Sequence, residues 1–282
     1  MRILTFDVEE WFHLLDNDST KSEVQWNTYE VRINKNMDRV FQILDDTNTK
    51  ATFFVIGWIA KKYPEIVKRI AKKYEIGSHT YNHQLVWQQS PEEFADDIVQ
   101  SKALLEDITG KQVKYFRAPG FSIRESESWA FEAIAKAGFE YDCSVFPAHH
   151  AHGGISSYGK VYPSIISHNG FFVKEFPISV VNVFNRNIIY SGGGYFRLFP
   201  YCLVKKWTEQ SSDYVLSYIH PRDLDSGQPM IKDLPLSRKF KSYVGLKGAE
   251  RKLRKWLTDF KFTDIQTAAS TIDWSAVAHL RF

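Results

Sequence analysis

One stretch decides the fold: Leu4-Thr5-Phe6-Asp7-Val8-Glu9-Glu10-Trp11, almost at the N-terminus. Its apolar residues, together with Ile3, are typical of a short buried strand. Buried strands seldom run directly into Asp-x-Glu-Glu, because unpaired carboxylates are costly to desolvate. The carboxyl ends of strands in α/β proteins are also where catalytic groups collect. The stretch therefore predicts either a solvated acidic turn or one edge of an active site.

Patterns typical of strands and helices alternate from this stretch as far as residue 141. Met37, Val40, Phe41 and Leu44 recur at the spacing of an amphipathic helix, and residues 90–93 form a helix-capping box. We predict helices at 37–44, 64–73, 90–110 and 129–138, and strands at 51–56, 75–77, 113–116 and 139–141. This alternation predicts parallel βα units, and therefore an α/β barrel or doubly wound sheet.

The second half of the chain is less regular. Residues 149–170 form a Gly/Ser/His-rich insertion, and 171–176 and 178–183 predict two strands of a hairpin or sheet extension. Residues 191–195 predict a flexible loop whose glycines let the backbone approach a ligand closely. We further predict a strand at 214–219, a basic helix at 249–257 and a last strand at 260–265.

The composition argues against several classes of protein. The chain has 282 residues, 44% hydrophobic and 24% charged, and a net charge of only +3 gives little support to nucleic-acid binding. The two cysteines form no CxxC pair, and acidic residues interrupt any N-terminal signal peptide. No apolar stretch reaches the length of a bilayer. We therefore expect a cytoplasmic protein without an integral membrane segment.

Two histidines have a spacing that suits a shared metal ion. His79 and His83 are four residues apart, which would put both imidazoles on one side of a helical turn. Such a pair also arises by chance. With a carboxylate from another strand, however, it would form an open metal site with room for a water molecule.

Three further polar residues follow predicted strands. Arg117 is either a surface residue or a guanidinium that holds a catalytic carboxylate ionised. Asp142 either caps a turn or orients a catalytic group, and His220 is either structural or a charged general acid. The residues alone leave these alternatives open.

The order of these motifs resembles that of the NodB-type polysaccharide deacetylases, carbohydrate esterase family 4. The motifs are Asp-x-Glu, HTxxH, RxPG, Tyr-Asp-x-Ser and a strand-ending His, and the resemblance covers residues 1–225. Residues 192–197, 236–240 and 243–246 are similar to a subgroup with a C-terminal extension that is associated with exopolysaccharide gene clusters. The resemblance implies a distorted (β/α) barrel of about seven parallel strands, with a β-rich insertion. It also implies an α/β extension, residues 226–282, packed on the same domain.

The resemblance implies a metal site formed by Glu9, His79 and His83. The common first motif of the family is TFDDG, and Val8 replaces its metal-binding aspartate here. Members with Asp-Val-Asp or Asp-Val-Glu use the acid two residues on, so Glu9 is the third ligand and Glu10 the reserve. One divalent metal is expected, Zn²⁺ first, with Fe²⁺, Co²⁺ or Ni²⁺ able to use the same ligands.

The resemblance also implies the acid–base roles. Asp7 would be the general base, Arg117 would hold it ionised, and His220 would be the general acid, kept protonated by Asp142.

Three residues are expected to contact the substrate or its oxyanion. The backbone near Gly120 would help to hold the oxyanion, and the rings of Trp11 and Tyr195 are candidate sugar contacts. The third motif is RAPG rather than the commoner RPPYG, and Val145 replaces the usual tryptophan of the fourth motif.

The implied activity is metal-dependent removal of N-acetyl groups from an amino sugar, in a polysaccharide or its nucleotide- or lipid-linked precursor. One alternative is a metal-independent cyclic amide hydrolase of the same fold, similar to allantoinases. The other is a catalytically silent carbohydrate-binding protein. The C-terminal extension is a candidate surface for oligomer formation.

Overall fold

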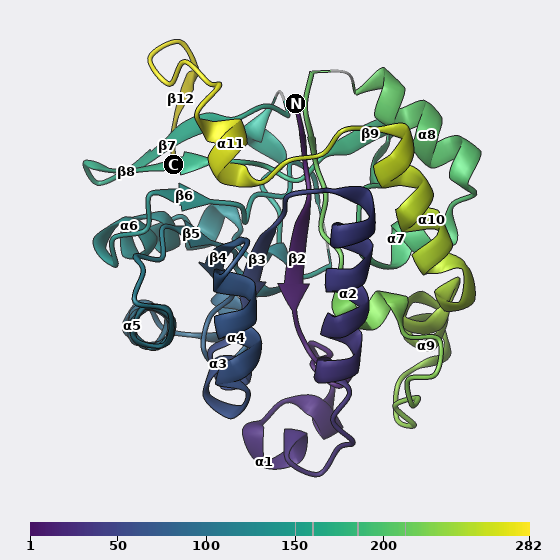
Figure 1. The fold of residues 1–282 in the computed structure, drawn as a ribbon. Coiled ribbons are helices and arrows are strands. Elements are labelled where there is room, and N and C mark those ends of the chain that lie inside the picture. Colours follow the sequence, from purple (N-terminus) through teal and green to yellow (C-terminus); the bar gives the residue numbers. More distant parts are fainter. Residues whose placement is uncertain (150, 160, 185, 212) are drawn as a thin grey trace. The chain divides into compact units, whose positions relative to one another are not determined.

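The polypeptide forms two units, each built from strands and helices. This computed structural model describes residues 1–282 except 150, 160, 185 and 212. Unit 1 consists of residues 1–52 and 179–268, and unit 2 consists of residues 53–178 and 269–282. The α/β class predicted from the alternating patterns is confirmed (Figure 1).

Unit 2 is organised around a mostly parallel sheet with the strand order β12-β7-β8-β6-β5-β4-β3. The strands are β3 (Thr52–Val55), β4 (Glu75–Ser78), β5 (Tyr115–Phe116), β6 (Tyr141–Asp142), β7 (Ser164–His168), β8 (Phe171–Glu175) and β12 (Ala278–Arg281). Strands β4, β5, β6 and β8 pair in parallel, with Ser78 opposite Phe116, Phe116 opposite Asp142, and Asp142 opposite Glu175. The carboxyl ends of these strands therefore meet at one edge of the sheet.

The helices of unit 2 connect these strands and lie beside the sheet (Figure 1). They are α3 (Gly57–Lys62), α4 (Pro64–Ala71), α5 (Pro91–Thr109) and α6 (Trp129–Lys136), with short 3₁₀ turns at Val86–Gln88, Pro119–Phe121, Glu125–Glu127 and Ser156–Tyr158. The predicted capping box of α5 is confirmed, since Ser90 Oγ accepts from Glu93 N at 3.2 Å and Glu93 Oε2 accepts from Ser90 N at 2.8 Å.

Unit 1 contains two strand pairs and strand β2. The strands are β1 (Arg2–Ile3), β2 (Thr5–Val8), β9 (Val180–Val183), β10 (Arg186–Ile189) and β11 (Val215–Leu216). β1 pairs with β11 in parallel, and β9 with β10 as an antiparallel hairpin. The pairing continues beyond β11, because Asp7 N donates to Ile219 O at 3.0 Å and Ile219 N donates to Thr5 O at 3.1 Å. This register brings His220 alongside the carboxylates of β2.

The helices of unit 1 include α2, which lies alongside β2 (Figure 1). They are α1 (Glu23–Trp26), α2 (Ile33–Thr47), α7 (Gly193–Leu198), α8 (Tyr201–Gln210), α9 (Leu236–Tyr243), α10 (Leu246–Asp259) and α11 (Ile265–Ala269), with 3₁₀ turns at Asp18–Thr20 and Pro221–Leu224. The predicted helices at 37–44 and 249–257 are confirmed as parts of α2 and α10.

Two predictions in the second half of the chain are wrong. Of the loop expected at 191–195, residues 193–195 instead begin α7, and Gly192 is its N-cap. Its glycines serve packing within the chain, because a Cβ atom on Gly192 would lie 2.2 Å from the carbonyl oxygen of Tyr218. Among the described residues, 260–265 contain no strand, only a bridge between Thr263 and Ile3, and the last strand is β12.

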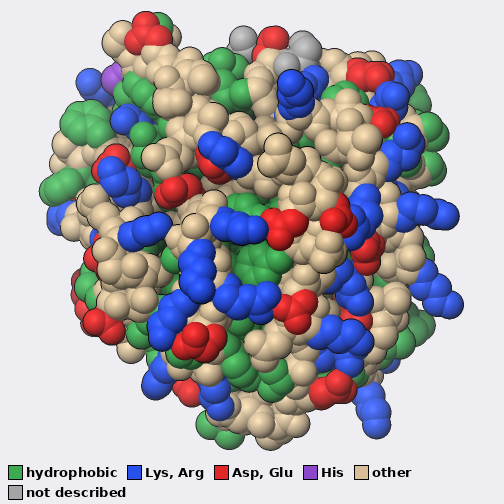
Figure 2. Space-filling view, viewed as in Figure 1, with side chains coloured by type: hydrophobic (Ala, Val, Ile, Leu, Met, Phe, Trp, Pro, Cys, Tyr) green, Lys and Arg blue, Asp and Glu red, His purple; other side chains and the backbone are tan. Residues whose placement is uncertain are grey.

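Basic side chains are interspersed with acidic ones over α4 and α10 (Figure 2). Arg254 of α10, for example, pairs with Asp46 at 2.7 Å and with Glu250 at 3.0 Å. No helix in the described part of the chain has the length and apolar character needed to cross a bilayer.

Candidate functional site

Predicted site residues of unit 2 lie where its parallel strands end. His79 follows β4, Arg117 follows β5, and Asp142 is the last residue of β6. The pairing of β4 with β5 and of β5 with β6 places the three at the same edge of the sheet. Sequence order alone therefore predicted their shared location correctly.

The two histidines come together through a loop and not through a helical turn. Residues 79–83 are irregular, and Thr80 and His83 have left-handed φ values of 62° and 54°. The imidazole rings nevertheless lie 5.2 Å apart. Asp97 of α5 holds this loop by accepting hydrogen bonds from Tyr81 N at 2.6 Å and Asn82 N at 2.9 Å. The two histidines are thus neighbours, as their i, i+4 spacing predicted, but a loop brings them together and not a helical turn. Sequence reasoning missed Asp97.

One hydrogen bond fixes the protonation of His79. Its Nδ1 lies 2.7 Å from the carbonyl oxygen of Arg117. Because a carbonyl can only accept, Nδ1 carries the hydrogen and Nε2 carries the lone pair. A backbone acceptor behind one ring nitrogen is the usual arrangement for a histidine that ligates a metal through the other.

Arg117 is completely buried in unit 2. Its Nε donates to Cys143 O at 3.2 Å, and its guanidinium carbon lies 4.2 Å from the centre of the Phe54 ring. Gly120, three residues on, has a φ of 61° within the turn that follows. The surface role that the sequence left open for Arg117 is thus wrong.

Asp142 has a carboxyl partner that sequence reasoning missed. Glu175, at the end of β8, is its register neighbour, and both side chains are completely buried. Burial raises the pKa of both groups, and the Asp142 charge helps to raise that of Glu175 well above its ordinary value. Ser144 Oγ donates to Asp142, and Val145 N donates to Glu175 at 3.0 Å. Of the two, Glu175 has the more strongly raised pKa, and hydrogen bonds within the unit hold both side chains.

Unit 1 brings two carboxylates, Asp7 at the end of β2 and Glu9 directly after it, to a histidine. Oxygens of Asp7 and Glu9 and a ring nitrogen of His220 all lie within 4.8 Å of one another. His220 Nε2 is 3.7 Å from Glu9 Oε1 and 4.0 Å from Asp7 Oδ2. Asp7 and Glu9 are both buried, whereas the His220 side chain is 19% exposed. Within unit 1, the acidic stretch is therefore buried beside a histidine and does not form a solvated turn.

The other nitrogen of His220 contacts Asp223. Nδ1 lies 2.9 Å from Asp223 Oδ2, and Asp223 Oδ1 lies 2.9 Å from Arg197 Nε. We expected Asp142 on this nitrogen, and that expectation is wrong because the 3₁₀ turn after His220 supplies its own carboxylate. The signal was present in the sequence as His-Pro-Arg-Asp, in which the fourth residue caps the turn that the first begins.

The charges in this cluster stabilise one another. Burial by itself would lower the pKa of His220, but the Glu9 and Asp223 carboxylates outweigh burial and raise this pKa to about 9. Burial would raise the pKa of Asp223, but Arg197 and His220 hold it well below its ordinary value. His220 is therefore cationic and Asp223 anionic at neutral pH.

Comparisons with known proteins relate two parts of the chain to known families. Residues 17–141 match the model of the polysaccharide deacetylase family. This part of the chain is therefore similar to the polysaccharide deacetylases. Residues 143–270 match a second family model, described as a domain of unknown function (DUF3473). The deacetylase match contains His79, His83 and Arg117, and the second match contains Glu175 and His220.

Two similar proteins are named as deacetylases of N-acetylated sugars. A peptidoglycan-N-acetylglucosamine deacetylase of Bacillus cereus is 36% identical over 96 residues, which are 33% of this chain and 35% of that protein. A chitooligosaccharide deacetylase of Azorhizobium caulinodans is 38% identical over 82 residues, 28% of this chain and 39% of that protein. The chain thus spans well under half the length of these relatives.

A solved structure has the same fold. A Mycobacterium smegmatis protein assigned to the polysaccharide deacetylases superposes with a TM-score of 0.69 and 16% identity, over 99% of this chain and 92% of that one. The fold expected from the resemblance is therefore confirmed.

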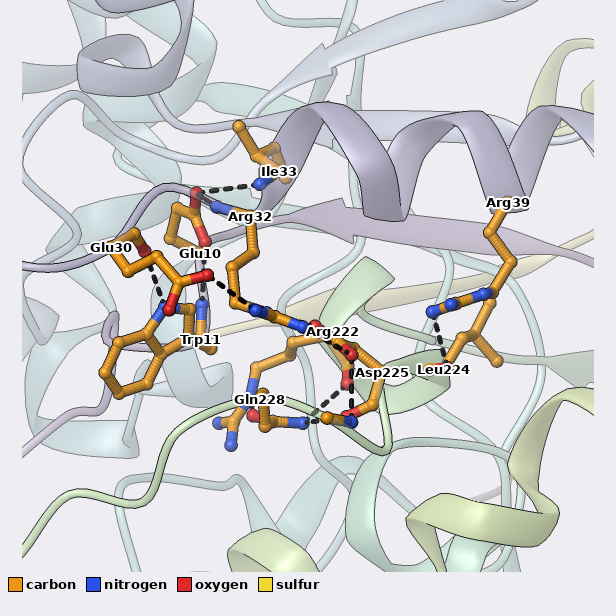
Figure 3. A network of polar contacts seen from close by, with 11 residues as sticks. Glu10, Trp11, Glu30, Arg32, Ile33, Arg39, Arg222, Leu224, Asp225 and Gln228 are labelled. Atoms are coloured by element: carbon orange, nitrogen blue, oxygen red, sulfur yellow. Dashed lines mark hydrogen bonds and ion pairs between the residues drawn. The ribbon is translucent and has the colours of Figure 1, made fainter.

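Glu10 and Trp11 do not take the roles expected for them beside the deacetylase motif. Glu10 Oε1 accepts from Arg32 N at 2.7 Å and Ile33 N at 2.8 Å, so its carboxylate caps the start of α2 (Figure 3). Trp11 is 3% exposed, and its indole donates to Glu30 O at 2.8 Å. A buried ring cannot stack on a sugar, so the prediction for Trp11 is wrong. Glu10 is a structural cap rather than a reserve ligand.

Tyr195 remains a candidate substrate contact. It lies on α7, is partly exposed, and stacks on Phe199 with ring centres 6.3 Å apart. It also lines a pocket together with His220.

Proposed function

We propose that the protein is a metal-dependent hydrolase that removes N-acetyl groups from an amino sugar. The observation that carries this proposal is the cluster of Asp7, Glu9 and His220 in unit 1. Two carboxylates face a histidine that a third carboxylate, Asp223, keeps protonated. Amide hydrolysis needs both a group that takes a proton from water and a group that gives one to the leaving amine.

We propose that Glu9, His79 and His83 bind one divalent metal ion. The tautomer of His79 fits this role, since the Arg117 carbonyl fixes the hydrogen on Nδ1 and directs the lone pair to Nε2. Two imidazoles and a carboxylate suit Zn²⁺, and Fe²⁺, Co²⁺ or Ni²⁺ accept the same donors. A bound metal of this kind polarises a carbonyl and lowers the pKa of its water.

The protein's own residues then carry the proton transfers. Asp7 takes the proton of the attacking water, and His220 donates from Nε2 to the nitrogen of the leaving amine. Asp223 holds His220 in the orientation and charge state for that donation, because Nδ1 faces its carboxylate at 2.9 Å. We propose that Arg117 keeps Asp7 ionised and that the backbone near Gly120 contributes to binding the oxyanion.

We propose an N-acetylated amino sugar of a polysaccharide, or of its nucleotide- or lipid-linked precursor, as the substrate. The names of the two relatives, which act on peptidoglycan N-acetylglucosamine and on chitooligosaccharides, support this class. An exopolysaccharide context, a cytoplasmic location, and a boundary at residue 225 between the catalytic domain and its extension belong to the same proposal.

Acetate release and metal content, measured on the same preparations, test the proposal. The wild-type protein should contain about one metal ion and release acetate from N-acetylated oligosaccharides. Asp7→Asn should keep the metal and lose activity, whereas His83→Ala should lose both. If both variants released acetate at the wild-type rate, the mechanism would be wrong. Activity in metal-free protein would favour the cyclic amide hydrolase, and full metal content without acetate release would favour the silent binding protein.

A further inference from the structure

A pocket of about 480 Å³ adjoins His220 in unit 1. Segment 218–223, α7 and α9 supply its lining, so it lies largely in the part of the chain described as a domain of unknown function. Tyr195, Leu198, Tyr218 and Phe240 form its apolar lining. Of all the residues that line the pocket, only His220 and Asp223 have a role in the proton transfers of the proposed reaction.

The charged lining of the pocket is predominantly cationic. It comprises Arg197, Arg222 and Lys241, against a single carboxylate, Asp223. That carboxylate is already held by Arg197 at 2.9 Å and by His220 at 2.9 Å. The positive charge of the pocket therefore exceeds what its own lining neutralises.

Arg222 is a buried cation of this pocket. It is only 7% exposed, and its acceptors are uncharged: Gln228 Oε1 at 3.0 Å and Ser242 O at 3.5 Å. Figure 3 shows its guanidinium on the Gln228 side of the network, away from the paired Arg32 and Asp225. Burial lowers the pKa of Arg222, and the charge of the Asp223 carboxylate offsets this only in part. A buried cation whose hydrogen-bond acceptors are uncharged is stabilised further when an anion joins it.

The pocket is also preformed. Arg197 donates from Nη1 to Val244 O at 2.7 Å and from Nη2 to Lys241 O at 3.1 Å, which ties α7 to α9. A Cβ atom on Gly194 would lie 2.7 Å from Lys241 O, and one on Gly245 would lie 2.4 Å from Arg197 O. Only glycine permits this close approach, so the shape of the pocket is fixed by the packing of the two helices.

We propose that this pocket binds an anionic group, a phosphate or a carboxylate, carried by the substrate next to the N-acetylated sugar. Arg222 and Lys241 are its counter-ions, and the aromatic lining packs on the sugar. This inference rests on the proposed function for its position, because a substrate whose amine meets His220 extends into the adjoining pocket. It narrows the substrate class to anionic amino sugars.

Matched sugars that differ in charge test the proposal. The kcat/KM for acetate release should be at least about tenfold higher with N-acetylglucosamine 1-phosphate or N-acetylmuramic acid than with neutral diacetylchitobiose. Which of the two acids is preferred distinguishes a phosphate site from a carboxylate site. Equal values for all three sugars would overturn the proposal.

Substitutions of residues that line the pocket test whether the preference for anionic sugars arises there. Lys241→Ala should raise KM for the preferred acid about two- to fivefold, and Arg222→Gln about tenfold or more, with kcat little changed. Neither should change KM for diacetylchitobiose. Lys239→Ala is the matched control, because Lys239 lies on the same helix and does not line the pocket. An equal loss with charged and neutral sugars would contradict the proposal, and Lys241→Ala decides the matter if Arg222→Gln does not fold.

Calorimetric titration separates this inference from the proposed function. If no sugar releases acetate, the proposed function fails, yet N-acetylglucosamine 1-phosphate should still bind more tightly to wild-type protein than to Lys241→Ala. Equal affinity for both proteins, or no binding to either, would overturn the pocket assignment independently of catalysis.

Discussion

Two clusters of buried carboxyl groups, one in each unit, differ in charge. In unit 1, Asp223 has Arg197 and His220 as partners, which hold its pKa low in spite of burial. In unit 2, Asp142 and Glu175 have each other, and burial raises the pKa of both. All three side chains are at most 5% exposed. The partner, and not the burial, therefore decides whether a buried carboxyl group is ionised.

This difference separates a catalytic cluster from a structural one. The ionised Asp223 can hold His220 protonated for donation to a leaving group. In unit 2, the raised pKa of Glu175 favours its neutral form, which can only donate and accept hydrogen bonds. Substitutions in the first cluster should therefore change the chemistry, and substitutions in the second should change how stability depends on pH.

The largest expected effect is that of removing the proposed acid. His220→Gln should lower kcat about 10²–10⁴-fold, because glutamine cannot transfer a proton to the leaving amine. Initial rates of acetate release, with folding checked by circular dichroism, measure the effect. A variant with more than half of the wild-type kcat would remove His220 from the mechanism.

The next effect is a change in the pH–rate profile. Asp223→Asn should move the alkaline limb downward from about 9, since the Asp223 carboxylate helps to raise the pKa of His220. A shift toward the ordinary histidine value of about 6.5 would lower the rate at pH 8 roughly tenfold or more.

Asp142→Asn is the matched control for that shift. This substitution replaces the carboxyl group that the sequence predicted beside His220. The alkaline limb of the pH–rate profile of Asp142→Asn should stay near that of the wild-type protein. A limb that moves in Asp142→Asn and not in Asp223→Asn would reverse the comparison between the two clusters.

A smaller effect is expected from the carboxyl pair of unit 2. The folded-state pKa of Glu175 is raised, so the pair loses stabilising free energy as pH rises from the unfolded value toward the folded one. Glu175→Gln keeps the shape and cannot ionise, so its melting temperature relative to wild type should increase between pH 5 and pH 8. Each kcal/mol of difference corresponds to about 2–4 °C. A difference that is constant with pH would show that Glu175 is not protonated in the native protein.

The smallest effect distinguishes the neighbouring glutamates of β2. Glu10→Ala should lower the melting temperature by about 2–4 °C through loss of the cap on α2, and should leave the metal content unchanged. Glu9→Gln should lose metal with little change in stability. Metal analysis and thermal denaturation of both variants measure this, and metal loss in Glu10→Ala alone would exchange the two roles.

Much of the fold was predictable because its signals are local. Alternating strand and helix patterns indicated the α/β class, and the capping box at Ser90 marked the start of α5. The signals failed where packing competed with them. Glycines at 192–194 were interpreted as a flexible loop, but they allow Tyr218 and α9 to approach α7 closely. Residues 260–265 have an apolar pattern but make only an isolated bridge.

In the candidate site, too, some features were predictable from the sequence and others were not. The ends of successive strands identified His79, Arg117 and Asp142, because parallel strands bring their carboxyl ends to one edge whatever the details of packing. The partners of these residues were not predictable. Trp11 was expected at a sugar and is buried against Glu30, and Glu175 was not considered at all.

The sequence by itself therefore determined the order of the elements and the chemical types at the strand ends. Local propensity and the alternation of apolar residues are properties of neighbouring positions along the chain. Only the tertiary structure decided that Asp223 contacts His220, that Glu10 caps α2, and that Asp142 lies opposite Glu175 in the sheet. The charge of a buried group depends on which long-range partner comes within a few ångströms of it, and that distance is set by packing alone.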